Sequence, residues 1–86
     1  MTLEEIVDMY GSSIGTHLVS RRVVKNIEGP CKGFKTYCIE LWDAVTQKKI
    51  MQIGTAGHMT DNNKKSIIEE VEKDFIKMMF AHYALK

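Results

Sequence analysis

The spacing of apolar residues changes twice along the chain. Near the N-terminus they recur every three or four positions, which is the period of one buried face of an α-helix. The members of this set are Leu3, Ile6, Val7 and Tyr10. Thr2 and Glu5 have the spacing of a capping box at a helix start, and Gly11 is a typical stop. The pattern therefore predicts a short helix that ends at Gly11.

Apolar and polar residues then alternate over three stretches, as they do along strands with one buried face. The segments 16–28 and 34–44 are rich in β-branched or aromatic residues and are separated by a Gly-Pro pair. After a short polar turn, the segment 48–54 is predicted to be a third strand. In the second strand, alternation predicts one face with Tyr37, Ile39 and Leu41, and an opposite face with Phe34, Thr36, Cys38, Glu40 and Trp42.

A helical period returns in the last third of the chain. The predicted buried stripe consists of Ile68, Val71, Phe75, Met78, Met79 and His82, and the outward residues are Glu69, Glu70, Lys73 and Lys77. Two starts for this helix are open. In one, Lys64 and Lys65 occupy the first turn, where a positive charge costs about 0.3–1 kcal/mol. In the other, Ser66 caps the helix with Glu69, and both lysines lie in a solvated loop.

The order helix, three antiparallel strands, helix predicts an α+β fold of one domain, residues 1–86. Both helices of this α-β-β-β-α two-layer sandwich are expected on one face of the sheet. The other sheet face, with Trp42 and Phe34, is then left for solvent or a partner. These two aromatic residues are candidates for a protein interface.

Composition narrows the class of protein. With 44% apolar and 27% charged residues in a chain of 86, we expect a small folded domain rather than a disordered segment. No apolar run approaches the ~20 residues of a membrane span, and the N-terminus is acidic where a signal peptide is basic. We therefore expect a cytoplasmic, unprocessed protein without a membrane partner, in which Cys31 and Cys38 are free thiols.

Side chains suited to catalysis or metal binding are not grouped in the sequence. His17, His58 and His82 are scattered, without metal-ligand spacing to each other or to the cysteines. The chain also has no glycine-rich phosphate loop, clustered acid pair or nucleophile with an orienting neighbour. The sequence therefore predicts no metal, no cofactor and no enzymatic activity.

Positive charge is concentrated in the middle of the chain. Residues 11–65 contain nine lysines and arginines against four acidic residues, whereas both ends are acidic. Such segregation is typical of a surface that binds a polyanion. Arg21, Arg22 and Lys25 are further candidate basic contacts, although strand alternation allows only one of the two arginines to share a face with Lys25.

Several short motifs occur in an order that resembles the double-stranded RNA-binding domain. A Gly-Pro pair follows the first strand, Lys35-Thr36-Tyr37 opens the second, GTAG follows the third, and NNKKS precedes the last helix. The family has Gly-Pro, Lys-Thr-Phe, Gly-x-Gly and Ser-Lys-Lys at these places, so the resemblance covers nearly the whole chain. Two departures are Lys32, which stands where the family has a histidine, and the acidic run that replaces alanines after the lysines.

The resemblance implies a protein that binds structured or double-stranded RNA through phosphates and 2′-hydroxyl groups. It assigns the first-helix contact to Glu5, the loop contact to Lys32 and Lys35, and the phosphate contact to Lys64 and Lys65. An alternative function is a small inhibitor or adaptor of the kind that viruses encode. Such a protein would block a ribonuclease or another nucleic-acid-handling enzyme. Its partner would then be an RNA-processing protein, and the two could form one complex together with RNA. The methionine-rich C-terminus suits either a core or a homodimer interface.

Overall fold

The computed structural model describes residues 1–27, 34–54 and 59–84, except for the side chains of Asn26, Ile27 and Phe34. Five elements follow one another in the predicted order α-β-β-β-α. They are α1 (Leu3–Ser13), β1 (Leu18–Ile27), β2 (Phe34–Asp43), β3 (Lys48–Gly54) and α2 (Lys64–Ala84). The predicted α+β fold is therefore confirmed. Lys32, Cys31 and His58 lie outside the described residues.

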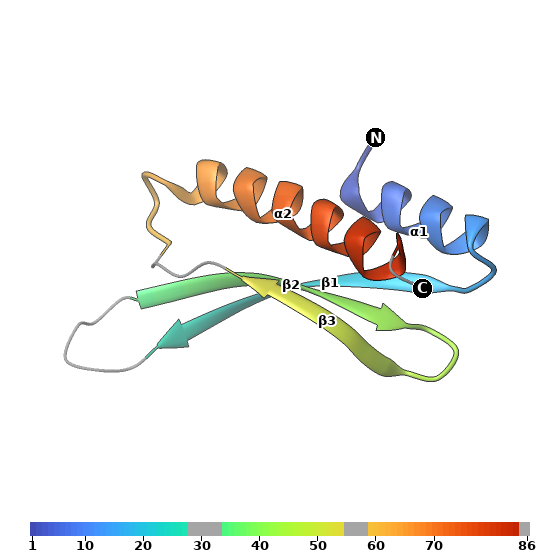
Figure 1. Ribbon diagram of the computed structural model, residues 1–86. Helices are drawn as coiled ribbons and strands as arrows, with labels where there is room; N and C mark the ends of the chain where they lie inside the picture. The colour runs from blue at the N-terminus through green and yellow to red at the C-terminus, as the bar shows by residue number, and fades with distance from the viewer. Residues whose placement is uncertain (28–33, 55–58, 85–86) are drawn as a thin grey trace.

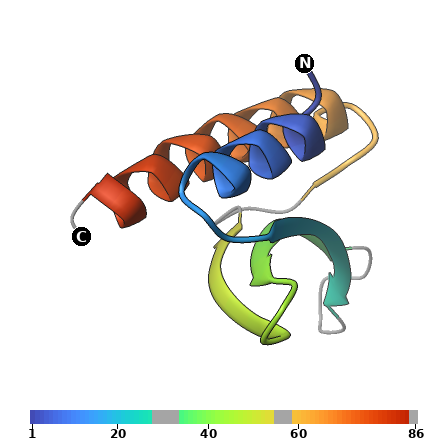
Figure 2. The same ribbon diagram turned by 90° about the vertical axis from the view of Figure 1, so that its right-hand side faces the viewer.

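The three strands form an antiparallel sheet of order β1-β2-β3. Both helices lie on one face of this sheet, α1 over β1 and α2 across β2 and β3 (Figures 1 and 2). The opposite face has no helix over it. We call the two sides of the sheet the helix-facing side and the open face.

The core lies between the helices and the helix-facing side of the sheet. Tyr37, Ile39 and Leu41 of β2 are at most 3% exposed, as their alternation predicts. They pack in one cluster with residues of both helices, including Leu3, Val7, Val71, Phe75 and Met79. Because the apolar side chains of β2 all point one way, both helices cover the same side of the sheet.

Helix α1 begins as predicted but continues past Gly11. Thr2 and Glu5 form the capping box, in which Thr2 Oγ1 accepts a hydrogen bond from Glu5 N at 3.2 Å. Gly11 is buried inside the helix, and a Cβ there would lie 3.0 Å from both Leu18 N and Thr16 O. The prediction of Gly11 as a stop was wrong, because the helix continues to Ser13. The absence of a side chain at Gly11 instead allows the close approach of the following chain.

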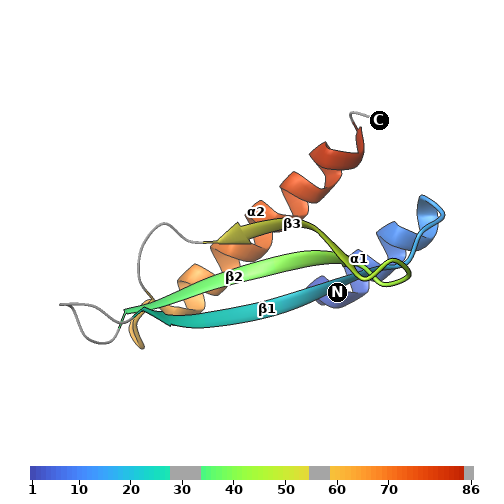
Figure 3. The same ribbon diagram turned by 90° about the horizontal axis from the view of Figure 1, so that it is seen from below.

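The C-terminal half of α2 buries fewer residues than predicted. Val71, Phe75 and Met79 are buried, whereas Met78 is 49% exposed and His82 is also exposed. The last turns of α2 project beyond the edge of the sheet at β3 (Figure 3). The predicted burial of Met78 and His82 was therefore wrong, because α2 turns Val71, Phe75 and Met79 to the core and leaves Met78 and His82 outside this stripe.

The start of α2 decides between the two alternatives left by the sequence. Ile67 N donates to the carbonyl oxygen of Asn63 at 2.9 Å, so Asn63 accepts the first helical hydrogen bond. Lys64 and Lys65 are therefore in the first turn, and Ser66 lies inside the helix rather than at its cap. Neither described helix is long and apolar enough to cross a membrane.

Candidate nucleic-acid interface

Two lysines occupy the N-terminal turn of α2. Lys64 and Lys65 are exposed, and no carboxylate among the described residues lies within ion-pair distance of either ammonium group. A helix N-terminus presents unpaired N–H groups and partial positive charge, which bind anions. Two unpaired lysines at this point add to that charge, so the local potential favours a phosphate.

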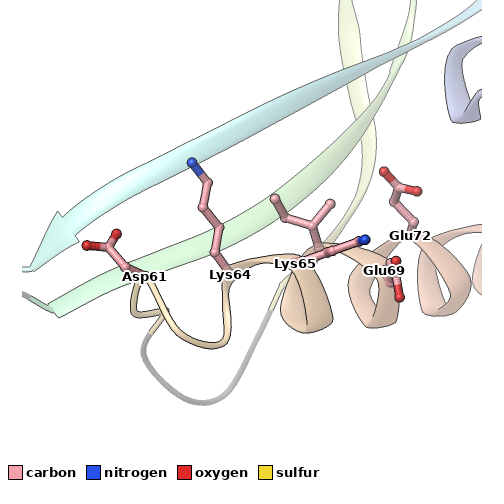
Figure 4. Close-up of a pocket in the computed structure, with 6 residues that line it drawn as sticks. Asp61, Lys64, Lys65, Glu69 and Glu72 are labelled. Atoms are coloured by element: carbon pink, nitrogen blue, oxygen red, sulfur yellow. The ribbon is translucent and has the colours of Figure 1, made fainter.

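A shallow hollow of about 450 Å³ lies beside these lysines. Figure 4 shows the Lys64 side chain extending to the side on which β1 and β2 run. The residues that line the hollow are Asp61, Lys64, Lys65, Ile68, Glu69 and Glu72. With three carboxylates against two ammonium groups, the interior of the hollow does not favour an anion. Phosphate contact is therefore favoured at the helix start, on the Lys64 side of the hollow.

The start of β2, to which Lys35 belongs, lies at the same end of the molecule as the start of α2 (Figure 1). Met59 N donates to the carbonyl oxygen of Lys35 at 2.6 Å, which joins the chain leading into α2 to the start of β2. By alternation with Tyr37 and Ile39, Lys35 belongs to the helix-facing side, and it is exposed. The structure therefore brings Lys35 near the α2 lysines, whereas Lys32 falls outside the described residues.

Glu5, the residue expected to make the first-helix contact, takes part in the capping box. Its Oε1 accepts hydrogen bonds from Thr2 Oγ1 at 3.1 Å and from Thr2 N at 3.4 Å. These hydrogen bonds give Glu5 a local role at the start of α1, and its side chain is exposed. The structure does not bring Glu5 into contact with the lysines of α2.

Arg22 has a structural environment that the sequence did not indicate. Its guanidinium contacts Glu4 of α1 at 2.9 Å and Glu72 of α2 at 2.7 Å. It also donates to the hydroxyl of the buried Tyr37. Burial lowers the pKa of Arg22, but the hydrogen bonds with Glu4, Tyr37 and Glu72 outweigh this effect and raise the pKa. Arg22 thus joins both helices to the sheet. Its charge is already paired with carboxylates of the protein, whereas Arg21 and Lys25 have no described carboxylate partner.

The open face carries a second group of polar side chains around Trp42. The indole Nε1 donates to Glu40 Oε1 at 3.0 Å, and the Arg21 guanidinium lies 5.1 Å from the centre of the indole ring. Lys49 Nζ lies 3.6 Å from Glu40 Oε2. Trp42 is half-buried on the open face, as its alternation predicted, while the side chain of Phe34 is not described.

Cys38 also lies on the open face, where it accepts a hydrogen bond from Gln52 Nε2 at 3.5 Å. Its thiol is free and 7% exposed. Across residues 1–27, 34–54 and 59–84, no three His, Cys, Asp or Glu side chains are grouped as metal ligands. Comparison with known proteins gives no match to a family, to a curated protein or to a solved structure.

Proposed function

We propose that this chain is an RNA-binding protein that resembles the double-stranded RNA-binding domain and holds phosphates at the N-terminus of α2. The observation that carries the proposal is the pair Lys64 and Lys65 in the first helical turn, without a described carboxylate partner. In the free protein these charges oppose the helix dipole at a cost of about 0.3–1 kcal/mol. A bound phosphate offsets that cost.

Lys35 extends the basic surface from α2 to the start of β2. The hydrogen bond from Met59 N to the carbonyl oxygen of Lys35 joins the chain that leads into α2 to the start of β2. A group of cations on neighbouring elements suits the regular phosphate backbone of a duplex, whose base edges are hidden in a deep and narrow major groove. The proposed ligand is therefore structured or double-stranded RNA, bound without chemistry and without strong sequence preference.

The neighbouring carboxylates restrict the contact rather than prevent it. Glu72 lies 2.7 Å from Arg22, so its charge is compensated within the protein. Glu69 and Asp61 remain beside the lysines and disfavour deep insertion of a phosphate. The proposed contact is consequently shallow and electrostatic, and its affinity should fall steeply with salt.

The test is a gel-shift panel of duplex RNA, single-stranded RNA and duplex DNA at two salt concentrations. In the double variant Lys64→Gln/Lys65→Gln, duplex RNA should bind more weakly, with a salt slope lower by about 0.9 for each phosphate that the lysines no longer neutralise. The matched control is Lys73→Gln/Lys77→Gln, which removes two exposed lysines from the outward face of the same helix. Equal affinity and slope in the two double variants would remove the α2 lysines from the proposed site.

A further inference from the structure

The open face has a positive balance of charge. Its described cations are Arg21 and Lys25 on β1 and Lys49 on β3, against Glu40 on the same face and Asp43, which lines the hollow beside Trp42 and Arg21. The Glu40 carboxylate already receives the Trp42 indole N–H and lies near Lys49 Nζ. No described carboxylate pairs with Arg21 or Lys25. The Arg21 guanidinium lies over the Trp42 ring, 5.1 Å from its centre, so a base that stacks on that side of the indole has to displace it.

Trp42 lies between cations of both outer strands. It is directly opposite Val19 on β1 and opposite Lys49 on β3, and Arg21 is the next open-face residue along β1. The hydrogen bond to Glu40 and the Arg21 guanidinium hold the indole in one orientation. Lys25 follows Arg21 by four residues, so at a rise of ~3.3 Å per residue it lies about 13 Å further along β1 than Arg21. Along β1, the cations Arg21 and Lys25 therefore extend away from the oriented Trp42 ring in one direction.

We propose that the open face is a second nucleic-acid site, which binds single-stranded RNA by stacking an unpaired base on Trp42 in place of the Arg21 guanidinium, and by contacting phosphates with the displaced Arg21 and with Lys25. An aromatic ring beside a track of cations is the usual arrangement for single strands, since every base has a face that can stack. A duplex keeps its bases stacked on one another, so it cannot use Trp42 in this way. This site rests on different residues from those at α2 and does not depend on them.

Nucleic acid fits this face better than a protein partner does. A protein interface has a mainly apolar centre with few charged residues. Here Trp42, Glu40, Arg21 and Lys49 are joined by a hydrogen bond, a cation–π contact and an ion pair, and the apolar residues beside them are Val19, Val23 and Cys38. Charge at the centre, with two cations that have no carboxylate partner among the described residues, complements a phosphate backbone.

The single tryptophan of the chain makes the test direct, because intrinsic tryptophan fluorescence then reports on the open face alone. The probes are an oligouridine RNA of about 12 nucleotides, within the usual range of site sizes, and a blunt RNA duplex of similar length. We expect the single strand to quench Trp42 fluorescence and the duplex to leave it nearly unchanged. Trp42→Leu should weaken single-strand binding, measured by the anisotropy of labelled RNA, by about 5- to 100-fold.

The charge contribution is tested by Lys25→Gln, with Lys48→Gln as the matched control. Both lysines are exposed strand residues, but Lys48 belongs to the helix-facing side. Lys25→Gln should lower the salt slope for the single strand by about 0.7, and Lys48→Gln should not change it. Circular dichroism shows whether Trp42→Leu folds. If it does not, Arg21→Gln and Lys25→Gln test the same site with Trp42 in place.

Three outcomes would overturn the open-face site. One is an oligouridine that binds without quenching Trp42, and another is equal salt slopes for Lys25→Gln and Lys48→Gln. The third is loss of single-strand binding and quenching in Lys64→Gln/Lys65→Gln, which would assign all RNA binding to α2. Loss of duplex binding alone in that variant would support both sites. Absence of duplex binding in the unmodified protein, with quenching by the single strand retained, would reject the α2 proposal and keep this one.

Discussion

Arg22 Nη1 donates to the hydroxyl of Tyr37 at 2.5 Å on the helix-facing side of the sheet. Tyr37 is 3% exposed, so this guanidinium supplies a hydrogen bond to a hydroxyl that has little access to water. The same guanidinium contacts Glu4 and Glu72, residues near opposite ends of the chain. One side chain therefore connects α1, α2 and β2.

Replacing Arg22 should destabilise the fold more than replacing its neighbour Arg21. Arg22→Ala removes the partner of the Tyr37 hydroxyl and leaves Glu4 and Glu72 without their cation, so we expect a loss of about 1–3 kcal/mol in the free energy of unfolding. Arg21→Ala removes an exposed stacking contact on Trp42 and should cost at most about 1 kcal/mol. Urea denaturation followed by circular dichroism measures both. Equal losses would contradict the structural role of Arg22.

Glu4 should make stability depend on pH in the acidic range. The hydrogen bond from Arg22 lowers the pKa of Glu4 below its ordinary value of 4.5. Its contribution to stability is therefore complete above pH 4.5 and is lost as the pH falls through the lowered pKa. The difference in unfolding free energy between the unmodified protein and Glu4→Gln should shrink as the pH is lowered from neutral to below 4.5. A difference that stays constant over this range would reject the contribution of Glu4.

Gly11→Ala should destabilise the protein although alanine is the better helix former. The added Cβ would lie 3.0 Å from two backbone atoms, Leu18 N and Thr16 O, which cannot move independently of the chain. We expect the strain to exceed the gain of about 1 kcal/mol in helix propensity, for a net loss of about 1–2 kcal/mol. Ser12→Ala, at an exposed position of the same helix, is the control and should be neutral or stabilising. An unchanged melting temperature in Gly11→Ala would show that the chain at Thr16 and Leu18 moves to make room for the methyl group.

Ser20→Ala should be neutral or stabilising. Ser20 is opposite Leu41 on the helix-facing side, and its buried Oγ has no hydrogen-bond partner among the described residues. Since an unpaired buried hydroxyl costs about 1–3 kcal/mol, its removal should raise the melting temperature by a few degrees. Scanning calorimetry measures this shift. A lowered melting temperature would mean that the hydroxyl is satisfied in solution.

The sequence predicts those parts of the fold that local patterns determine. Alternation in β2 correctly separates Ile39 and Leu41 from Trp42, because a strand offers its side chains only two directions. The segment 48–54 matches β3 at both ends, since charged residues and glycine mark its limits. The capping box of α1 is also a local pattern, and it is confirmed.

Features that depend on distant parts of the chain could not be predicted in this way. Gly11 meets backbone from the next element, and the exposure of Met78 beside the buried Met79 depends on how α2 is rotated over the sheet. The ion pairs of Arg22 depend on how α1 and α2 are placed over β1. At the candidate site, the sequence supplied Lys64 and Lys65 but left their position open, and the hydrogen bond from Ile67 to Asn63 placed them in the helix.

The strand order β1-β2-β3 also bears on how copies of this protein behave at high concentration. Within the described sheet, the outer strands β1 and β3 each have one edge without a neighbouring strand, and such edges can pair between molecules and start aggregation. β1 carries Arg21 and Lys25, which have no described carboxylate partner, and β3 begins with Lys48 and Lys49. Pairing of like edges would bring these positive charges close together. The basic residues of the sheet thus also oppose edge-to-edge growth, and more strongly at low salt than at high salt.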